Sequence, residues 1–203
     1  MIIVRCWLEK LFKWAFESAY FDDYGFNPKM INLLFDNDKT IPLKFHVQRT
    51  IICPSKDITK NKLESILERL VISEFLLIDF TEFDNVEQQR VDILLKTLIN
   101  KGDKIRQVTF ELHSSLSEIY DNIVEYLATS RDCSKIVPDI RFGYTKPINF
   151  KLSERAEKVK KSKDLKSTNY QISNIYHPEV KFNFYSGELE IESSTDIYRI
   201  IKM

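Results

Sequence analysis

Helical and strand-like hydrophobic patterns alternate through the middle of this chain. Apolar side chains recur at helical spacing in residues 57–70 and again in 86–99, and the apolar run at 74–80 between them has the length of a buried strand. Strand patterns also occupy 106–112 and 135–142. Helix–strand units of about thirty residues return the chain in one direction. The pattern therefore predicts an α/β protein of short helix–strand units around a small, mostly parallel, leucine-rich-repeat-like sheet.

The N-terminal region is patterned differently and is predicted to begin with one helix over residues 2–20. Charges of alternating sign recur every four residues from Arg5 to Glu17, and the apolar surface around them is wider than a surface helix needs. The rest of the chain, a protein partner or a membrane surface could cover it. The side chains that we assign to partner binding are Trp7, Leu11, Phe12 and Trp14.

A β-hairpin is predicted after this helix, at residues 30–52. The polar tetrapeptide DNDK separates two apolar runs there, and the second run alternates apolar and polar side chains. We therefore divide the chain into an N-terminal helix and hairpin, residues 1–55, and an α/β interaction domain with a C-terminal β segment, residues 56–203.

A lysine-rich stretch precedes the C-terminal β segment. Residues 151–166 contain seven Lys or Arg and three Asp or Glu, which is typical of a solvated helix turn and an exposed loop. A phosphate-binding patch at Lys158–Lys166 is the alternative, although no interleaved aromatic residues support base stacking. Residues 170–203 alternate as strands, with a turn predicted at Ser186–Gly187.

Composition argues against several classes of function. Thirty basic and thirty acidic side chains cancel, so nucleic-acid binding is not expected. The four glycines are too scattered to form a phosphate-binding loop, and no histidine or cysteine pair has metal-ligand spacing, so we expect no cofactor and no metal. Three widely spaced cysteines and the lack of a long apolar segment predict an intracellular, cytoplasmic or nuclear protein without a membrane span.

Three side chains could carry catalysis. Asp79 and Glu111 lie at or near the ends of successive predicted strands, and His113 follows the second of them, where α/β enzymes place reactive groups. A small hydrolase or nuclease could use this set. Structural roles explain the same residues, with Asp79 bonding its loop and Glu111 facing solvent. Ser115 is equally explained as the N-cap of a helix, with Glu118 completing a capping box.

The order of features from about residue 57 to 203 resembles the F-box-associated, FTH-type regions of nematode proteins. Leucine-rich helix–strand units such as LERLVISEFLLIDF come first, a polar stretch follows, and a segment beginning YQISN ends the chain. The resemblance implies a non-enzymatic substrate-recognition component of a cullin ubiquitin ligase. Such proteins bind a Skp1-like adaptor through an N-terminal F-box. Residues 1–50 lack the leucine–proline opening of an F-box, so the helix at 2–20 would be a remnant of one.

Overall fold

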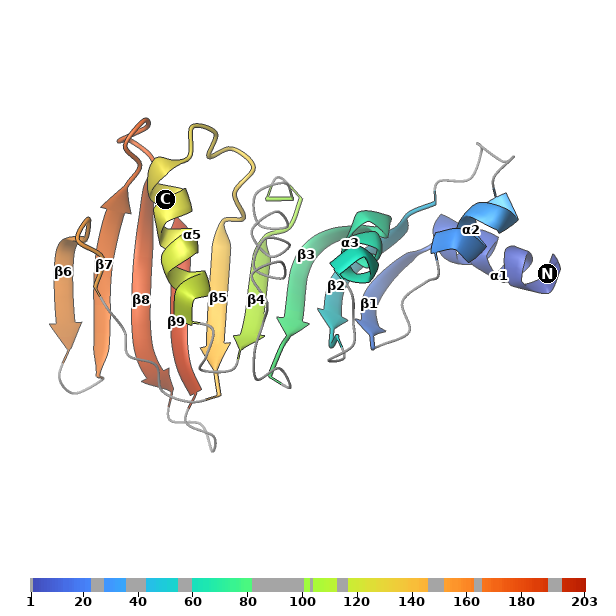
Figure 1. The fold of residues 1–203 in the computed structure, drawn as a ribbon, viewed down its shortest axis with the longest axis horizontal. Coiled ribbons are helices and arrows are strands. Elements are labelled where there is room, and N and C mark those ends of the chain that lie inside the picture. The colour runs from blue at the N-terminus through green and yellow to red at the C-terminus, as the bar shows by residue number, and fades with distance from the viewer. Residues whose placement is uncertain are drawn as a thin grey trace.

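A nine-stranded mixed sheet, in the order β1-β2-β3-β4-β5-β9-β8-β7-β6, forms the framework of the protein (Figure 1). The computed structural model describes residues 2–22, 28–35, 43–54, 60–81, 101–102, 104–112, 117–145, 152–162, 166–189 and 195–203. The described helices are α1 (Ile2–Lys13), α2 (Pro28–Phe35), α3 (Lys60–Arg69) and α5 (Ser117–Thr129). The strands are β1 (Ala15–Phe21), β2 (Phe45–Ile52), β3 (Leu70–Asp79), β4 (Gln107–Leu112), β5 (Asp139–Tyr144), β6 (Glu157–Ser162), β7 (Ser167–Ser173), β8 (Lys181–Leu189) and β9 (Thr195–Lys202).

The α/β class is confirmed, but the sheet is larger and more mixed than predicted. Strands β1 to β5 pair in parallel, in chain order. Strands β9, β8, β7 and β6 then continue the sheet with antiparallel pairing. Parallel pairing requires a crossover between strands, and a helix lies between β1 and β2, β2 and β3, and β4 and β5.

Alternation along the strands buries one face of the sheet. Ile78, Phe110 and Phe142 are neighbours in register on β3, β4 and β5, and each is fully buried. Helix α5 lies across this face near the antiparallel strands (Figure 1). Its Tyr120 ring contacts Phe142, and its hydroxyl lies 2.7 Å from that of Tyr170 on β7. The intervening side chains point to the opposite side, which we call the open face, and many of them are partly exposed.

Two N-terminal predictions are wrong. The helix predicted over 2–20 ends at Lys13, and β1 begins at Ala15, where it pairs in parallel with β2. The predicted hairpin at 30–52 is instead the end of helix α2 followed by strand β2. Pro28 opens α2, a position that suits proline because the first helical N–H has no partner within the helix. Strand β2 lies before the division predicted at residue 55 and pairs in parallel with β3, which lies after it; the division itself stays a prediction.

The central and C-terminal predictions have mixed outcomes. Strands predicted at 74–80, 106–112 and 135–142 correspond to β3, β4 and β5, and the helix predicted at 57–70 corresponds to α3. The helix predicted at 86–99 lies outside the described residues. Part of the lysine-rich stretch forms strand β6 rather than a helix turn, and Ser186–Gly187 lies within β8 rather than at a turn. Pairing with β7 and with β9 accounts for both differences.

Candidate functional site

Two of the three candidate catalytic residues lie side by side on the open face. Asp79 on β3 pairs in register with Glu111 on β4, and Glu111 pairs with Gly143 on β5. A Cβ atom added to Gly143 would lie 2.1 Å from Oε2 of Glu111, so the carboxyl group occupies the space above this glycine. His113 and Ser115 lie outside the described residues. The structure therefore brings together the two carboxyl groups of the predicted set.

The two carboxyl groups have different environments. Oδ1 of Asp79 accepts hydrogen bonds from the Thr81 backbone N–H at 2.9 Å and from the Thr81 hydroxyl at 2.7 Å, which is the loop-bonding role expected from the sequence. Burial, and then the neighbouring Asp79 carboxylate, raise the pKa of Glu111. A carboxyl with a raised pKa beside a second carboxyl could transfer a proton to or from a bound molecule.

Metal binding finds no support among the residues that the structure describes. No group of three or more His, Cys, Asp or Glu side chains is arranged there to hold a metal ion.

A second polar cluster on the open face joins β5 to β9. Oδ2 of Asp139 accepts hydrogen bonds from Nη2 of Arg141 and from Nη2 of Arg199, both at 2.9 Å. Burial alone would raise the pKa of Asp139, but the hydrogen bonds from Arg199 and Arg141 outweigh it and hold the pKa below its usual value. This cluster links the last parallel strand to the antiparallel part of the sheet. The sequence holds one sign of this cluster. Asp139 and Arg141 are two residues apart on a strand, so both side chains lie on the same face.

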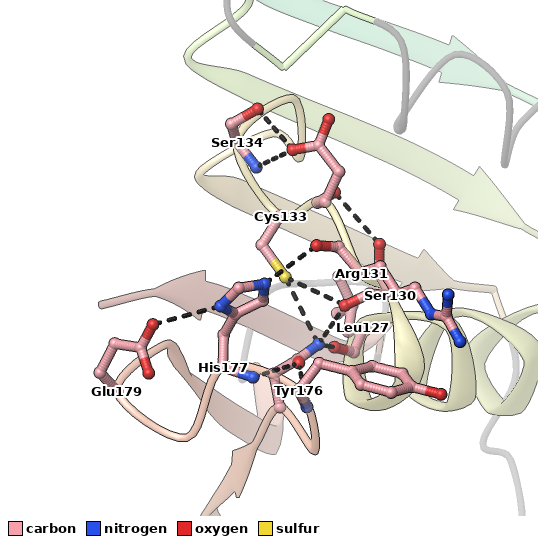
Figure 2. Close-up of polar contacts among 10 residues, drawn as sticks. Leu127, Ser130, Arg131, Cys133, Ser134, Tyr176, His177 and Glu179 are labelled. Atoms are coloured by element: carbon pink, nitrogen blue, oxygen red, sulfur yellow. Dashed lines mark hydrogen bonds and ion pairs between the residues drawn. The ribbon is translucent and has the colours of Figure 1, made fainter.

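The densest polar network described lies at the C-terminal end of α5 (Figure 2). Asn174, which follows β7 and is 1% exposed, donates from Nδ2 to the carbonyl oxygens of Leu127 and Ser130, both at 2.8 Å. Its Oδ1 accepts from the backbone N–H groups of Tyr176 at 2.9 Å and His177 at 3.0 Å. Carbonyls in the last turn of a helix lack partners within the helix, so Asn174 caps α5 from another part of the chain. No local sequence pattern predicts that Asn174 caps this helix.

The same corner contains a cysteine and a histidine, in positions that suit structure better than catalysis. Sγ of Cys133 donates to the Ser130 carbonyl at 3.7 Å and accepts from Asn174 at 3.4 Å. Burial raises the pKa of Cys133, which keeps it a thiol rather than a nucleophilic thiolate. The His177 ring lies between the Arg131 carbonyl, 3.0 Å from Nε2, and the Glu179 carboxylate, 3.3 Å from Nδ1 (Figure 2).

The four residues assigned to partner binding separate into core and surface. Phe12 is 1% exposed, and its ring contacts Phe35 and Phe45 with centroid distances of 5.6 and 4.5 Å. The assignment of Phe12 to a partner surface is therefore corrected, because its side chain is already enclosed by the fold. Leu11 is partly buried against the same core. Trp7 and Trp14 are 67% and 64% exposed.

Helix α1 carries further apolar side chains on its surface that we had not singled out. Ile3 is 74% exposed and Val4 is 45% exposed. Trp7 follows them by four and three residues, so the three side chains share one face of the helix. We call Ile3, Val4 and Trp7 the N-terminal apolar patch. Apolar side chains grouped in this way on a surface mark a site of interaction more often than single ones do. No helix among the described residues is long and apolar enough to cross a membrane.

Comparison with known protein families gives a match to the N-terminal part of the chain. Residues 1–81 are similar to a family described as a domain of unknown function, DUF8381. The matched segment contains α1, α2 and α3 and the first three parallel strands. No curated protein and no solved structure matched the chain.

Proposed function

We propose that this protein is a non-enzymatic interaction module that binds a protein partner through the N-terminal apolar patch. The exposure of Ile3 and Trp7 on one helix face carries the proposal. Burying such side chains in a protein interface removes apolar surface from water, a gain of roughly 25 cal/mol per Å² before the costs of association.

The more specific version is a substrate-recognition component of a cullin ubiquitin ligase. It rests on the resemblance to F-box-associated regions, in which the N-terminal part contacts a Skp1-like adaptor and the rest holds a substrate. Strands β1, β2, β3 and β5 each follow a described helix, which supports the leucine-rich-repeat-like version of the fold.

The experiment compares the wild-type chain with an Ile3→Glu/Trp7→Glu double variant as baits for quantitative co-purification. Ile175→Glu is the matched control, because Ile175 is also an exposed apolar side chain but lies in the loop after β7. We expect a partner that the wild type and the control retain and the double variant loses. Identical partner sets for all three baits would overturn the proposal.

The ligase version has its own test with purified components. A Skp1-like adaptor should bind the wild-type chain and the Ile175→Glu control, and should not bind the double variant. Absence of binding to the wild-type chain would remove the ligase version and leave the interaction module standing.

The alternative is a small hydrolase or nuclease that uses Asp79, Glu111 and His113. The adjacent carboxyl groups and the raised pKa of Glu111 support it. Assays with simple ester and phosphodiester substrates test it. Turnover by the wild type that both Asp79→Asn and Glu111→Gln abolish would favour the enzyme, whereas turnover unaffected by both would exclude these residues.

A further inference from the structure

A groove of about 450 Å³ lies at the β6 end of the sheet. We call it the polar groove, and its lining comes from β6, β7, β8 and β9: Lys158, Lys160, Asn169, Tyr170, Gln171, Asn183, Phe184, Tyr185 and Ile201. Its volume falls in the range of about 300–1,000 Å³ typical of ligand clefts. The described part of the lining contains two lysines and no carboxylate, so the groove favours an anionic ligand.

Strand β6 is distorted where it forms one wall of the groove. Its pairing with β7 shifts register between Glu157 and Lys160, and Lys158 has a φ of 50°. A residue other than glycine is strained in this left-handed region, and such strain is concentrated at functional sites. Lysines on an edge strand also discourage unwanted strand pairing, but that role requires neither the register shift nor the positive φ.

Amide side chains line the middle of the groove. Nε2 of Gln171 donates to Oδ1 of Asn183 at 2.8 Å, and Asn183 in turn donates to Sδ of Met203. Oε1 of Gln171 is buried and accepts no hydrogen bond from any described residue. A buried acceptor without a donor is unfavourable, so an N–H group of a ligand that reached Oε1 would remove this penalty.

The positive charge of the groove is not neutralised by its described neighbours. Neither Lys158 nor Lys160 forms an ion pair with a described residue. Glu157, the nearest acidic residue on β6, accepts a hydrogen bond from the Ser173 hydroxyl at 3.3 Å. Among the described residues, no carboxylate therefore forms an ion pair with either ammonium group, and both attract carboxylates or phosphates.

We propose that the polar groove binds an acidic peptide segment in an extended conformation. The lysines would contact its carboxylates, while Gln171 and Asn169 can each donate to and accept from peptide groups. Single-stranded nucleic acid would also be attracted by the charge, but it needs several aromatic rings for stacking. Tyr185 is the aromatic side chain of the lining that points to the open face. The amide content thus favours a peptide.

This inference is independent of the N-terminal apolar patch. The patch belongs to α1, which precedes edge strand β1, and the groove lies beside β6 at the opposite edge of the sheet. Failure of one proposal leaves the other untouched, because different variants and different ligands test them.

The test measures fluorescence anisotropy of a labelled peptide that alternates glutamate and serine, with the full-length protein as titrant. Lys158→Glu/Lys160→Glu should weaken binding by about tenfold or more, because two attractive charges become two repulsive ones. Lys161→Glu is the control on the same strand, and it reverses one lysine charge where the double variant reverses two. Lys161 pairs with Thr168, one position along from the Lys160–Asn169 pair, and so points to the other face.

The results separate binding in the groove from general charge attraction. Binding that the double variant loses and Lys161→Glu retains within about twofold would support the groove. Gln171→Ala should weaken binding as well, without changing the charge. Equal weakening by the double variant and Lys161→Glu would reduce the effect to general charge attraction and overturn the proposal. Absence of peptide binding, or tighter binding of an oligothymidine of matched charge, would also overturn it; circular dichroism melting of each variant verifies folding.

Discussion

Replacing Asn174 with alanine removes the side chain that connects the C-terminal end of α5 to the loop after β7. The substitution leaves the carbonyls of Leu127 and Ser130 without their donor and the N–H groups of Tyr176 and His177 without their acceptor. Each intramolecular hydrogen bond contributes about 1 kcal/mol net, and a buried group left unpaired costs more. We therefore expect a loss of about 3–4 kcal/mol in the free energy of unfolding, a large share of the roughly 5–15 kcal/mol of a typical domain.

Urea unfolding followed by far-ultraviolet circular dichroism measures this loss. Asn122→Ala is the matched control, because Asn122 is an exposed asparagine within α5, the helix that Asn174 caps. It should change the free energy of unfolding by no more than about 0.5 kcal/mol. Asn174→Ala within about 1 kcal/mol of the control would refute the capping role assigned to the side chain.

Asn174→Asp separates the two halves of the network. Its carboxylate can still accept from Tyr176 and His177 but cannot donate, and it faces the carbonyl oxygens of Leu127 and Ser130. The repulsion raises the pKa of the new carboxyl. Its protonated form is therefore favoured in the folded state, and the variant should regain stability relative to the wild type as pH falls below that pKa. A deficit independent of pH would contradict this account.

Three further predictions concern packing and charge. Gly102→Ala should destabilise the fold by about 1–3 kcal/mol or more, because the added Cβ would lie 1.9 Å from the Lys135 carbonyl oxygen. Gly143→Ala meets only the movable Glu111 side chain and should cost less in the same urea titration. Phe12→Ala should cost about 3–5 kcal/mol and Trp14→Ala no more than about 0.5 kcal/mol, and equal losses would contradict their assignment to core and surface. Burial lowers the pKa of Lys101 from 10.5 to about 8, so the unfolded chain binds the proton more tightly and the free energy of unfolding should rise from about pH 8 to 10. Melting temperatures measured against pH should show this rise for the wild type and a flatter profile for Lys101→Met. A flat wild-type profile would contradict the lowered pKa of Lys101.

The local hydrophobic pattern was sufficient to predict a strand where a single periodicity dominated the segment. The apolar run around Leu76 and Ile78 predicted a buried strand, and both side chains are fully buried in β3. The alternation of Phe182 and Phe184 likewise predicted a strand with one buried face, as β8 shows. Around these side chains a single buried pattern meets no competing signal, so propensity and burial agree. Further along β8, Ser186–Gly187 did carry a competing turn signal, and the turn predicted there is wrong.

Competing signals misled the N-terminal predictions. Arg5 and Glu9 do form the expected pair, at 2.8 Å, yet the helix stops before Glu17, the last charge of the same stripe. Aromatic residues from Trp14 onward suit a strand, and the parallel pairing of Ala15 with His46 is a distant interaction that helical spacing cannot reveal. Tertiary pairing here overrides a charge pattern worth only about 0.3–0.5 kcal/mol per pair.

Sites assembled from distant segments were largely hidden from the sequence. Asn174 caps a helix that ends more than forty residues earlier, and only the packing of α5 on the sheet brings them together. The polar groove likewise depends on the register of β6, β7 and β8, whereas the sequence displayed only a lysine-rich stretch. Asp79 and Glu111 were predictable as neighbours, because parallel strands of successive units bring equivalent positions into register.

The two proposed surfaces depend on different parts of the sheet. These parts meet at β5, where the pairing changes from parallel to antiparallel. Strands β1 to β3 depend on crossovers that contain α2 and α3, and the N-terminal apolar patch lies on α1 before them. Strands β7, β8 and β9 pair antiparallel, and α5 covers them through the contacts of Tyr120 with Phe184 and Tyr198. Loss of the Asn174 cap should therefore weaken the part of the sheet that forms the polar groove first. Binding at the N-terminal apolar patch should persist under mild denaturing conditions that abolish binding at the groove.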